Sequence, residues 1–379
     1  MEPRVVEMND PSLLPSLGEL WDRLHRQTPG ATFFQTWEWL ATTWRHFGRP
    51  QKLRLMMIYE GDEPVGIVPF CVREETYRVG KLRVLSYPLD DWGPFYGPLG
   101  ADPVRYQELA LDHVMQTERD WDMIDLRTIR EQDPDFAQID AAIRQRDATA
   151  FIRPRMEVPV VQLEGTWEDY LAGQSRNWRR NMKREKQRVE EVGTLEFVRY
   201  RHVAGETFST DHCRGMFDEC QQVAERSWQA DSSLGAAFCS PRVKPVLRDL
   251  HMTAAKKGML DVNLLRLDGE PVAFLYNYVC QGQVYALRSG YDANCPAQSL
   301  GTVLLAEVIR DSYERGDRLI NLGPGTQDYK LRFAGEIHRA ICYTLYSRQS
   351  VRSQLLRARY AIDQRLPGFE GRCRNRLIK

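Results

Sequence analysis

The sequence lacks the features that mark several common classes of protein. Positive and negative charges balance, with 52 lysines and arginines against 52 aspartates and glutamates, so the whole chain has no bias toward nucleic acid or membranes. It contains no apolar run of about 18 residues, the length that a membrane-spanning helix needs. The residues after Met1 lack the apolar core of a signal peptide. We therefore expect a cytoplasmic protein without a membrane span.

Cysteine and histidine show no metal-binding pattern. The eight cysteines include no Cys-x-x-Cys pair, and the seven histidines are scattered. In a chain of this length, such a pattern is typical of reduced, mostly buried thiols in a reducing compartment. We therefore expect no metal.

The composition fits two globular domains. The chain has 379 residues, of which 42% are hydrophobic and 27% charged. Two predicted hairpins, Met56–Ile67 and Leu264–Phe274, share one design: an apolar strand, an acidic residue with glycine, Glu-Pro-Val and a second apolar strand. In each half a further strand, a helix and another strand follow. This repetition predicts two copies of one α/β unit, with chance similarity of two hairpins as the alternative.

Hydrophobic periodicity and turn residues predict the elements. The expected helices cover 11–25, 35–46, 103–117, 134–146, 166–192, 209–228, 241–257 and 299–315. The expected strands cover 53–59, 64–73, 82–87, 123–128, 195–201, 262–267, 272–279, 283–289, 318–322 and 341–347. We divide the chain into an N-terminal module (1–160), a C-terminal module that carries the site (161–349) and a basic C-terminal helix (350–379).

A series of short motifs lies in the second half. In chain order they are Asp268–Ala273, Ser289–Asp292, Ser299–Leu305, Asn321–Gly325 and Tyr329–Phe333. Their order resembles that of the GNAT acyltransferases, and more narrowly the CelD-like branch of cellulose biosynthesis loci, which is related to the Fem aminoacyltransferases. The segment Phe34–Trp39 also looks like the start of the family's first module. The resemblance implies an α/β fold of tandem GNAT-like modules, each a mixed central sheet flanked by helices.

A donor site is expected where a strand leads through small residues into a helix. Strand 283–289, loop 297–302 and helix 303–315 have this order, and exposed amides at a helix N-terminus can hold a pyrophosphate. The ordinary alternative is a capped strand-to-helix connection. The resemblance implies acyl-CoA, as acetyl-CoA or a longer acyl-CoA, as the co-substrate. The expected contacts are Leu287, Ser289, Gln298, Ser299, Leu300, Gly301 and Thr302.

The resemblance also implies that two neighbouring parallel strands separate, here at Tyr285–Gly290 and Leu319–Gly323. Backbone amides in that gap would stabilise the oxyanion of an acyl-transfer intermediate. Tyr329 is expected to protonate the leaving group, and Lys330 to stabilise negative charge. Asn321 would orient an amine or a carbonyl. The structural alternatives are a surface lysine beside a half-buried tyrosine, and an asparagine that satisfies buried backbone.

Candidate substrate-binding residues come from both halves. Arg288 would meet an anionic substrate, or else form a salt bridge with Asp292 or a neighbour. In the first module, an aromatic and acidic set would bind the acceptor amine or a sugar. Packing in the core is the alternative for the tryptophans. The set consists of Trp37, Trp39, Asp90, Asp91, Trp92 and Tyr96, of which Trp37, Asp90, Trp92 and Tyr96 are the binding candidates.

The segment 176–188 is strongly basic, with seven lysines and arginines against one acid. On a helix it would contact phosphates of tRNA, CoA or a nucleotide sugar, and Trp178 would stack on a base. A solvated helix face is the usual alternative. The stretch 350–379 is also basic, with eight lysines and arginines against two acids, which indicates an anionic surface partner.

Three functions follow from these features. The first is acyl transfer from acyl-CoA to an amine or hydroxyl of a small-molecule or saccharide acceptor, in polysaccharide or cell-envelope biosynthesis. The second is a Fem-like, tRNA-dependent aminoacyl transfer that uses the basic segment 176–188. The third is a non-catalytic module that binds a partner, which the loosely glycine-rich loop 294–302 and Asn321 favour, since relatives often carry an acidic residue there.

Overall fold

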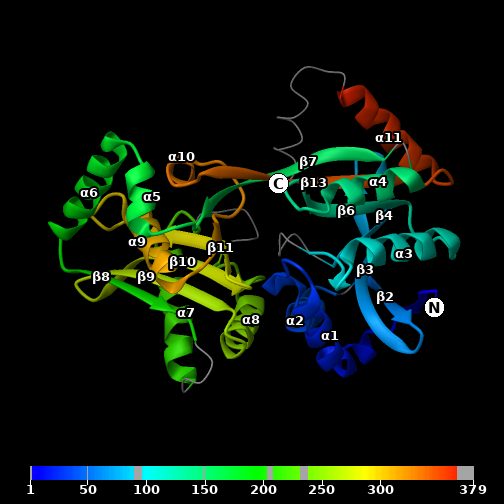
Figure 1. The fold of residues 1–379 in the computed structure, drawn as a ribbon, viewed down its shortest axis with the longest axis horizontal. Coiled ribbons are helices and arrows are strands. Elements are labelled where there is room, and N and C mark those ends of the chain that lie inside the picture. Colours follow the sequence, from blue (N-terminus) through cyan, green and yellow to red (C-terminus); the bar gives the residue numbers. More distant parts are fainter. Residues whose placement is uncertain are drawn as a thin grey trace. The chain divides into compact units, whose positions relative to one another are not determined.

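The computed structural model describes residues 2–48, 50–88, 96–147, 150–202, 208–230 and 238–364. The chain forms two compact units, residues 1–157 with 338–379, and residues 158–337 (Figure 1). Within the described residues, no helix is both long and apolar enough to cross a membrane. The same residues contain no group of three or more histidine, cysteine or acidic side chains placed to hold a metal ion.

The first unit contains a mixed sheet covered by helices on both faces. Its strands are ordered β1-β2-β3-β4-β6-β13, and all neighbours are antiparallel except the parallel pair β4 and β6. Its elements are β1 (Arg4–Met8), the 3-10 helix η1 (Pro11–Leu17), α1 (Gly18–Gln27), the 3-10 helix η2 (Phe33–Gln35), α2 (Trp37–Phe47), β2 (Lys52–Glu60), β3 (Glu63–Tyr77), β4 (Gly80–Ser86), β5 (Leu99–Gly100), α3 (Pro103–Gln116), β6 (Met123–Arg130), α4 (Phe136–Arg146), β7 (Phe151–Gln162), β13 (Glu336–Tyr346) and α11 (Val351–Gln364). The last residues of β7 and the first of β13 belong to the second unit.

The second unit repeats this arrangement. Its strands are ordered β8-β9-β10-β11-β12-β7, and again one pair, β11 with β12, is parallel while the others are antiparallel. Its elements are α5 (Trp167–Gly173), α6 (Arg176–Glu190), β8 (Leu195–Tyr200), α7 (Thr210–Glu225), α8 (Lys244–Lys256), β9 (Leu260–Leu267), β10 (Glu270–Cys280), β11 (Gln283–Tyr291), α9 (Leu300–Arg315), β12 (Leu319–Asn321) and α10 (Asp328–Leu331). The shared topology confirms the predicted tandem mixed sheets.

Alternation along β10 explains how its sheet carries helices on both faces. Ala273 and Leu275 belong to a core cluster with the apolar side of α9, whereas Phe274 and Tyr276 pack against aromatic rings on the opposite face. Both predicted hairpins are present. Their turns need positive φ, which Gly61 (63°) and Gly269 (87°) provide without steric cost.

Two predictions about the elements are wrong: one about a long helix and one about the unit to which a strand belongs. The helix expected over 166–192 is two helices, because the Ser175 hydroxyl accepts a hydrogen bond from the Trp178 amide and starts a new helix. The strand expected over 341–347 was assigned to the second module, but β13 pairs with β6 and belongs to the first unit. Pairing between segments about 200 residues apart is set by tertiary contacts, which local pattern does not reveal.

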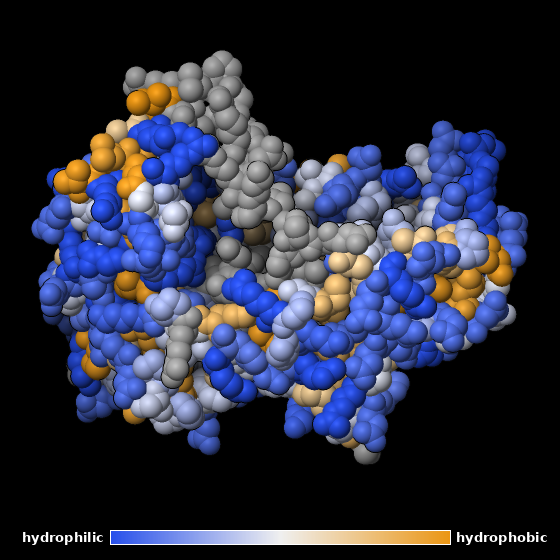
Figure 2. All heavy atoms as spheres, turned by 180° about the vertical axis from the view of Figure 1, so that it is seen from behind, coloured by the Kyte–Doolittle hydropathy of each residue, from blue (hydrophilic) through white to orange (hydrophobic). Residues whose placement is uncertain are grey.

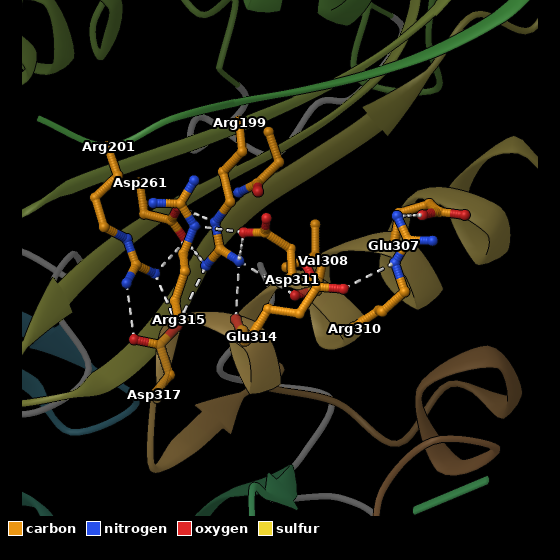
Figure 3. A network of polar contacts seen from close by, with 12 residues as sticks. Arg199, Arg201, Asp261, Glu307, Val308, Arg310, Asp311, Glu314, Arg315 and Asp317 are labelled. Carbon is orange, nitrogen blue, oxygen red and sulfur yellow. Dashed lines mark hydrogen bonds and ion pairs between the residues drawn. The ribbon is translucent and has the colours of Figure 1, made fainter. Parts of the chain in front are cut away.

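A buried ion network attaches α9 to the sheet of the second unit (Figure 3). Arg199 on β8 donates to Asp261 on β9 at 2.7 Å and to Asp311 on α9 at 2.8 Å. Arg201 donates to Asp317 at 2.7 Å, just beyond the helix. Burial alone would raise the pKa of Asp261, but the two arginines hold it well below its usual range. The network fixes the C-terminal half of α9, and with it the direction of its N-terminus.

Candidate functional site

The site lies where the parallel pair β11 and β12 ends. Only three residues of each strand pair, from Gln283 with Leu319 to Tyr285 with Asn321. Beyond that point β12 stops, while β11 continues to Tyr291 with β10 as its strand neighbour. The expected separation therefore begins after Tyr285, and backbone groups on this edge of β11 have no described strand opposite them.

A bulge lies at the point where the strands separate. Tyr276 faces Arg288 and the next residue, Asn277, faces Ala286, so Leu287 is an extra residue on β11. A bulge of this kind bends the strand and turns a side chain away from its regular direction. Leu287, expected to contact the donor, is 8% exposed at this bulge.

A glycine allows the loop after β12 to lie against β11. Gly323 has φ of +76°, and a Cβ there would come within 2.9 Å of the Ala286 carbonyl oxygen. Its amide donates to the Asn321 side-chain oxygen at 3.0 Å. The Asn321 side-chain oxygen is thus committed to this turn, which matches the structural alternative for that residue. The loop then leads into α10.

Lys330 is a buried amine beside the free edge of β11. Its side chain is buried, and its Nζ donates to the carbonyl oxygens of Gly323 at 3.2 Å and Pro324 at 2.9 Å. Burial, and next the positive charge of Arg288, lower its pKa to about 8. Such an amine is still charged at neutral pH, yet close enough to its pKa to respond to a nearby anion.

Two further predicted residues meet at the same place. Burial raises the pKa of the Tyr329 phenol, and a hydrogen bond with the Ser289 side chain opposes that shift. Arg288 donates to the Leu287 carbonyl at 2.6 Å, and burial lowers its pKa to about 10. Asp292, which was considered as a partner of Arg288, pairs with Arg226 at 3.1 Å.

The predicted phosphate loop leads into the first turn of α9. Leu300, Gly301 and Thr302 occupy this turn, and the first intrahelical bond to the loop runs from the Val303 amide to the Ser299 carbonyl. Ser299, in the left-handed region at φ of 63°, gives no capping bond from its side chain. The first-turn amides can therefore donate hydrogen bonds to phosphate oxygens. Gln298 and Ser299 are exposed, and Gly301 lies beside Tyr291.

The acceptor residues expected in the first unit are packed or undescribed. The Trp37 indole donates to the Leu14 carbonyl at 2.7 Å and packs at the edge of a core cluster. Tyr96 is 6% exposed, and burial raises its pKa well above its usual range. Asp90 and Trp92 lie outside the described residues. A binding role for these four residues stays a prediction.

The basic segment forms α6, and its tryptophan faces inward. The Trp178 indole donates to the Arg332 carbonyl at 2.8 Å and meets the Phe333 ring edge-on. Tyr170 of α5 donates to the Phe333 carbonyl at 3.0 Å. Trp178 therefore supports the chain just after Lys330, which does not match its expected role of stacking on a base.

Sequence reasoning missed Gln229. This buried side chain donates to the Ser289 carbonyl at 3.1 Å and accepts from the Phe238 amide at 2.8 Å. A Cβ on Gly290 would meet its amide nitrogen at 3.1 Å. Gln229 thus holds the far end of β11 in place, and no motif around it signalled that contact.

Comparison with known proteins places this site inside a recognised domain. Residues 176–331 match the family model for the acetyltransferase (GNAT) domain. No sequence relative was found among curated proteins. The match covers β11, the first turn of α9, β12 and α10, and it supports an acyltransferase.

Solved structures share the fold of the whole chain. The C-terminal domain of a putative lysylphosphatidylglycerol synthetase from Agrobacterium fabrum aligns with a TM-score of 0.56 and 14% identity, over 93% of this chain and 98% of that one. L-PGS from Bacillus licheniformis aligns with a TM-score of 0.53 and 14% identity, over 92% and 95%. FemX aligns with a TM-score of 0.57 and 9% identity, over 92% and 98%. At these identities the likeness concerns the fold.

Proposed function

We propose that the second unit transfers an acyl group from acyl-CoA to an amine or hydroxyl acceptor. The observation that carries this proposal is the early end of the β11 and β12 pairing, with Lys330 and Tyr329 beside the edge left free. A thioester carbonyl on this edge would meet backbone amides of β11. The pyrophosphate would bind the first turn of α9, through Leu300, Gly301 and Thr302.

The reaction follows from this placement. The acceptor nitrogen or oxygen attacks the thioester carbonyl carbon, a new C–N or C–O bond forms, and the C–S bond then breaks. Lys330, as a cation, stabilises the oxyanion of the intermediate, and Tyr329 gives its proton to the departing thiolate. The acceptor loses one proton to solvent, and Tyr329 is reprotonated from solvent. Positioning of the two reactants supplies much of the remaining rate gain.

The acceptor class is the finer part of the proposal. We favour a saccharide or a cell-envelope precursor, because the sequence motifs resemble the CelD-like branch and one structural neighbour is described as a putative lysylphosphatidylglycerol synthetase. The buried Lys330 and the half-buried Arg288 place two cations at the site. An acceptor or donor with a carboxylate or phosphate near the reacting atoms would therefore bind better than a neutral analogue.

Calorimetry with acetyl-CoA tests the donor. Gly301→Ala adds a Cβ that makes ordinary contact with Tyr291 at 3.8 Å, so affinity is expected to change little. Gly301→Asp places a negative charge in the first turn of α9. This charge stabilises the helix but repels the pyrophosphate, so the Kd for acetyl-CoA should rise at least about tenfold. Equal affinities for both variants, or no binding of acetyl-CoA or longer acyl-CoA, would contradict acyl-CoA as donor.

A tRNA-dependent aminoacyl transfer is the second candidate, and the surface of α6 favours it. Six basic side chains on this helix are exposed and have no acidic partner among the described contacts: Arg176, Arg179, Arg180, Lys183, Arg184 and Arg188. Such a surface suits a phosphate backbone. FemX and L-PGS share the fold, so the fold is compatible with an aminoacyl-tRNA donor.

Charge reversal on α6 separates the two donors. Arg179→Glu with Lys183→Glu should weaken tRNA binding at least about tenfold and flatten its dependence on salt, because fewer counterions are released. Lys256→Glu, at an exposed lysine of α8, is the matched control. Unchanged tRNA affinity in the α6 variant removes this candidate and leaves the acyl-CoA proposal standing.

A further inference from the structure

Helix α11 exposes a continuous apolar stripe, which we define as Val351, Leu355, Ala358 and Ile362. Val351 is 75% exposed, Leu355 is 56% exposed and Ile362 is 62% exposed, and Ala358 is also exposed. Their spacing of four, three and four residues places all four on one face of a helix. Figure 2 shows hydrophobic residues at its upper left, where this view places α11.

The stripe faces away from the core of the first unit. The opposite face of α11 packs through Leu356, and Tyr360 stacks on Phe151 at 5.7 Å. Leu356 joins a cluster with residues of β4, β6 and β13, and Ser353 is fully buried on the same side. The packing fixes which face of α11 is outward. Exposed apolar side chains arranged in this way mark interaction surfaces more often than single exposed residues do.

Arginines lie on both flanks of the stripe. Arg352 and Arg359 lie on one flank of the helix and Arg357 on the other, at about 100° per residue. Residues 350–379 carry eight lysines and arginines against two acids, although the whole chain has a net charge of zero. An apolar helix face bordered by arginines is the pattern of helices that lie in the plane of a membrane interface.

We propose that the stripe of α11 docks on a bilayer surface that carries anionic lipid headgroups. Its apolar side chains enter the headgroup boundary, and the flanking arginines meet the negative surface charge. A second copy of this chain is a poorer occupant, because a symmetric contact would bring like-charged flanks together. Residues 365–379 carry five lysines and arginines against one acid, so they meet the same repulsion. The inference is independent of the proposed acyl transfer.

Vesicle sedimentation of the full-length protein tests this surface. The protein should sediment with phosphatidylcholine vesicles that contain phosphatidylglycerol and should stay in solution with pure phosphatidylcholine. Leu355→Glu with Ile362→Glu should reduce binding to the anionic vesicles at least about tenfold. Arg352→Gln should reduce it about fivefold, and added salt should weaken all binding. Leu13→Glu, at another exposed leucine of the first unit, should have no effect.

Further measurements separate loss of membrane binding from loss of folding or of a dimer contact. Urea unfolding checks that the variants fold. If the double glutamate variant does not fold, Arg352→Gln and the salt series still test the same surface. Equal sedimentation with both vesicle types, or with neither, overturns the proposal. So does a dimer seen by light scattering without vesicles that disappears in the double variant, because that result assigns the stripe to a second copy. Acyl-CoA binding is expected to stay unchanged in every variant.

Discussion

The two units share one topology but differ at the end of their parallel strand pair. In the first unit, Val84 and Leu85 pair with Met123 and Ile124, and the Ser86 hydroxyl then donates to the Asp125 carbonyl at 2.7 Å. In the second unit β12 ends after three residues and a glycine loop replaces the rest of the strand. The parallel pairing is thus short in both copies, and a serine side chain bridges the two strands at its end in the first unit, where a glycine loop follows β12 in the second.

The charges at the two places differ as well. In the first unit the buried Asp125 carboxylate accepts from Arg127 at 2.7 Å and from Arg153 at 2.8 Å, so opposite charges meet within the protein. In the second unit, the buried Lys330 and the half-buried Arg288 lie at the corresponding end, and the charge of Arg288 adds to burial in lowering the pKa of Lys330. Under the proposed function, the two copies share a frame, and a few side chains distinguish the copy that would carry the reaction.

The largest expected effect is a loss of acyl-transfer rate on substitution in the second unit but not in the first. Lys330→Met should lower acyl transfer by about 100-fold or more, because it removes the cation that faces the oxyanion. Ser86→Ala, at the end of the parallel pair in the first unit, should leave the rate within a factor of about two. Thiol release from acyl-CoA with each purified protein measures both. Equal losses in the two variants would show that the second unit has no special role.

Removal of the Asp125 carboxylate should affect stability rather than binding. Asp125→Ala leaves Arg127 and Arg153 buried without this partner, at a cost of about 3 kcal/mol in the free energy of unfolding. Burial would raise the pKa of Asp125, but the arginines hold it below its usual range, so its contribution is present at neutral pH and is lost only in strong acid. Urea unfolding measures the cost, and an unchanged Kd for acetyl-CoA is expected.

Two glycines test the close approach of the loop to β11. Gly323→Ala requires φ of +76° and a Cβ within 2.9 Å of the Ala286 carbonyl, so we expect a loss of about 2 kcal/mol and a slower reaction. Gly316→Ala has the same backbone demand at +73° but open space around its Cβ. It should cost about 1 kcal/mol and leave the rate unchanged. Similar rates in the two variants would contradict a site at Gly323.

The pH dependence follows from the Lys330 pKa of about 8. A reaction that needs the charged amine should slow about tenfold per pH unit above that value. Stability should change in the opposite sense. The folded pKa lies below the usual 10.5, so the cost of burying the charge is present below pH 8 and is relieved as pH rises toward 10.5. A rate that increases through pH 8 would instead indicate a neutral amine acting as a base.

Much of the fold could be predicted from local pattern. The hairpins at Gly61 and Gly269 and the repeated order of elements follow from hydrophobic alternation and turn residues. The break at Ser175 was missed, because a cap inside a long polar, basic stretch gives little signal. The place of β13 was missed because its partner, β6, is distant in sequence.

The site was only partly predictable. Motif order indicated Lys330 and Tyr329, but only the structure shows that Lys330 is buried against the Gly323 and Pro324 carbonyls. The hydrogen bonds of Asn321 and Trp178 hold the backbone around the site, which residue type alone did not indicate. A catalytic role for Asn321 stays a prediction. Burial and side-chain direction depend on packing partners from other segments, so residue type alone does not reveal them.

Amide hydrogen exchange with and without acetyl-CoA tests the central claim most directly. The account predicts slower exchange at Leu287, Arg288 and Ser289 and at residues 300–302 when the ligand is added, with no change at Ser86 and Tyr87 in the first unit. Protection that appears at Ser86 and Tyr87 instead, or at neither strand end, would contradict the assignment of the donor site to the free edge of β11.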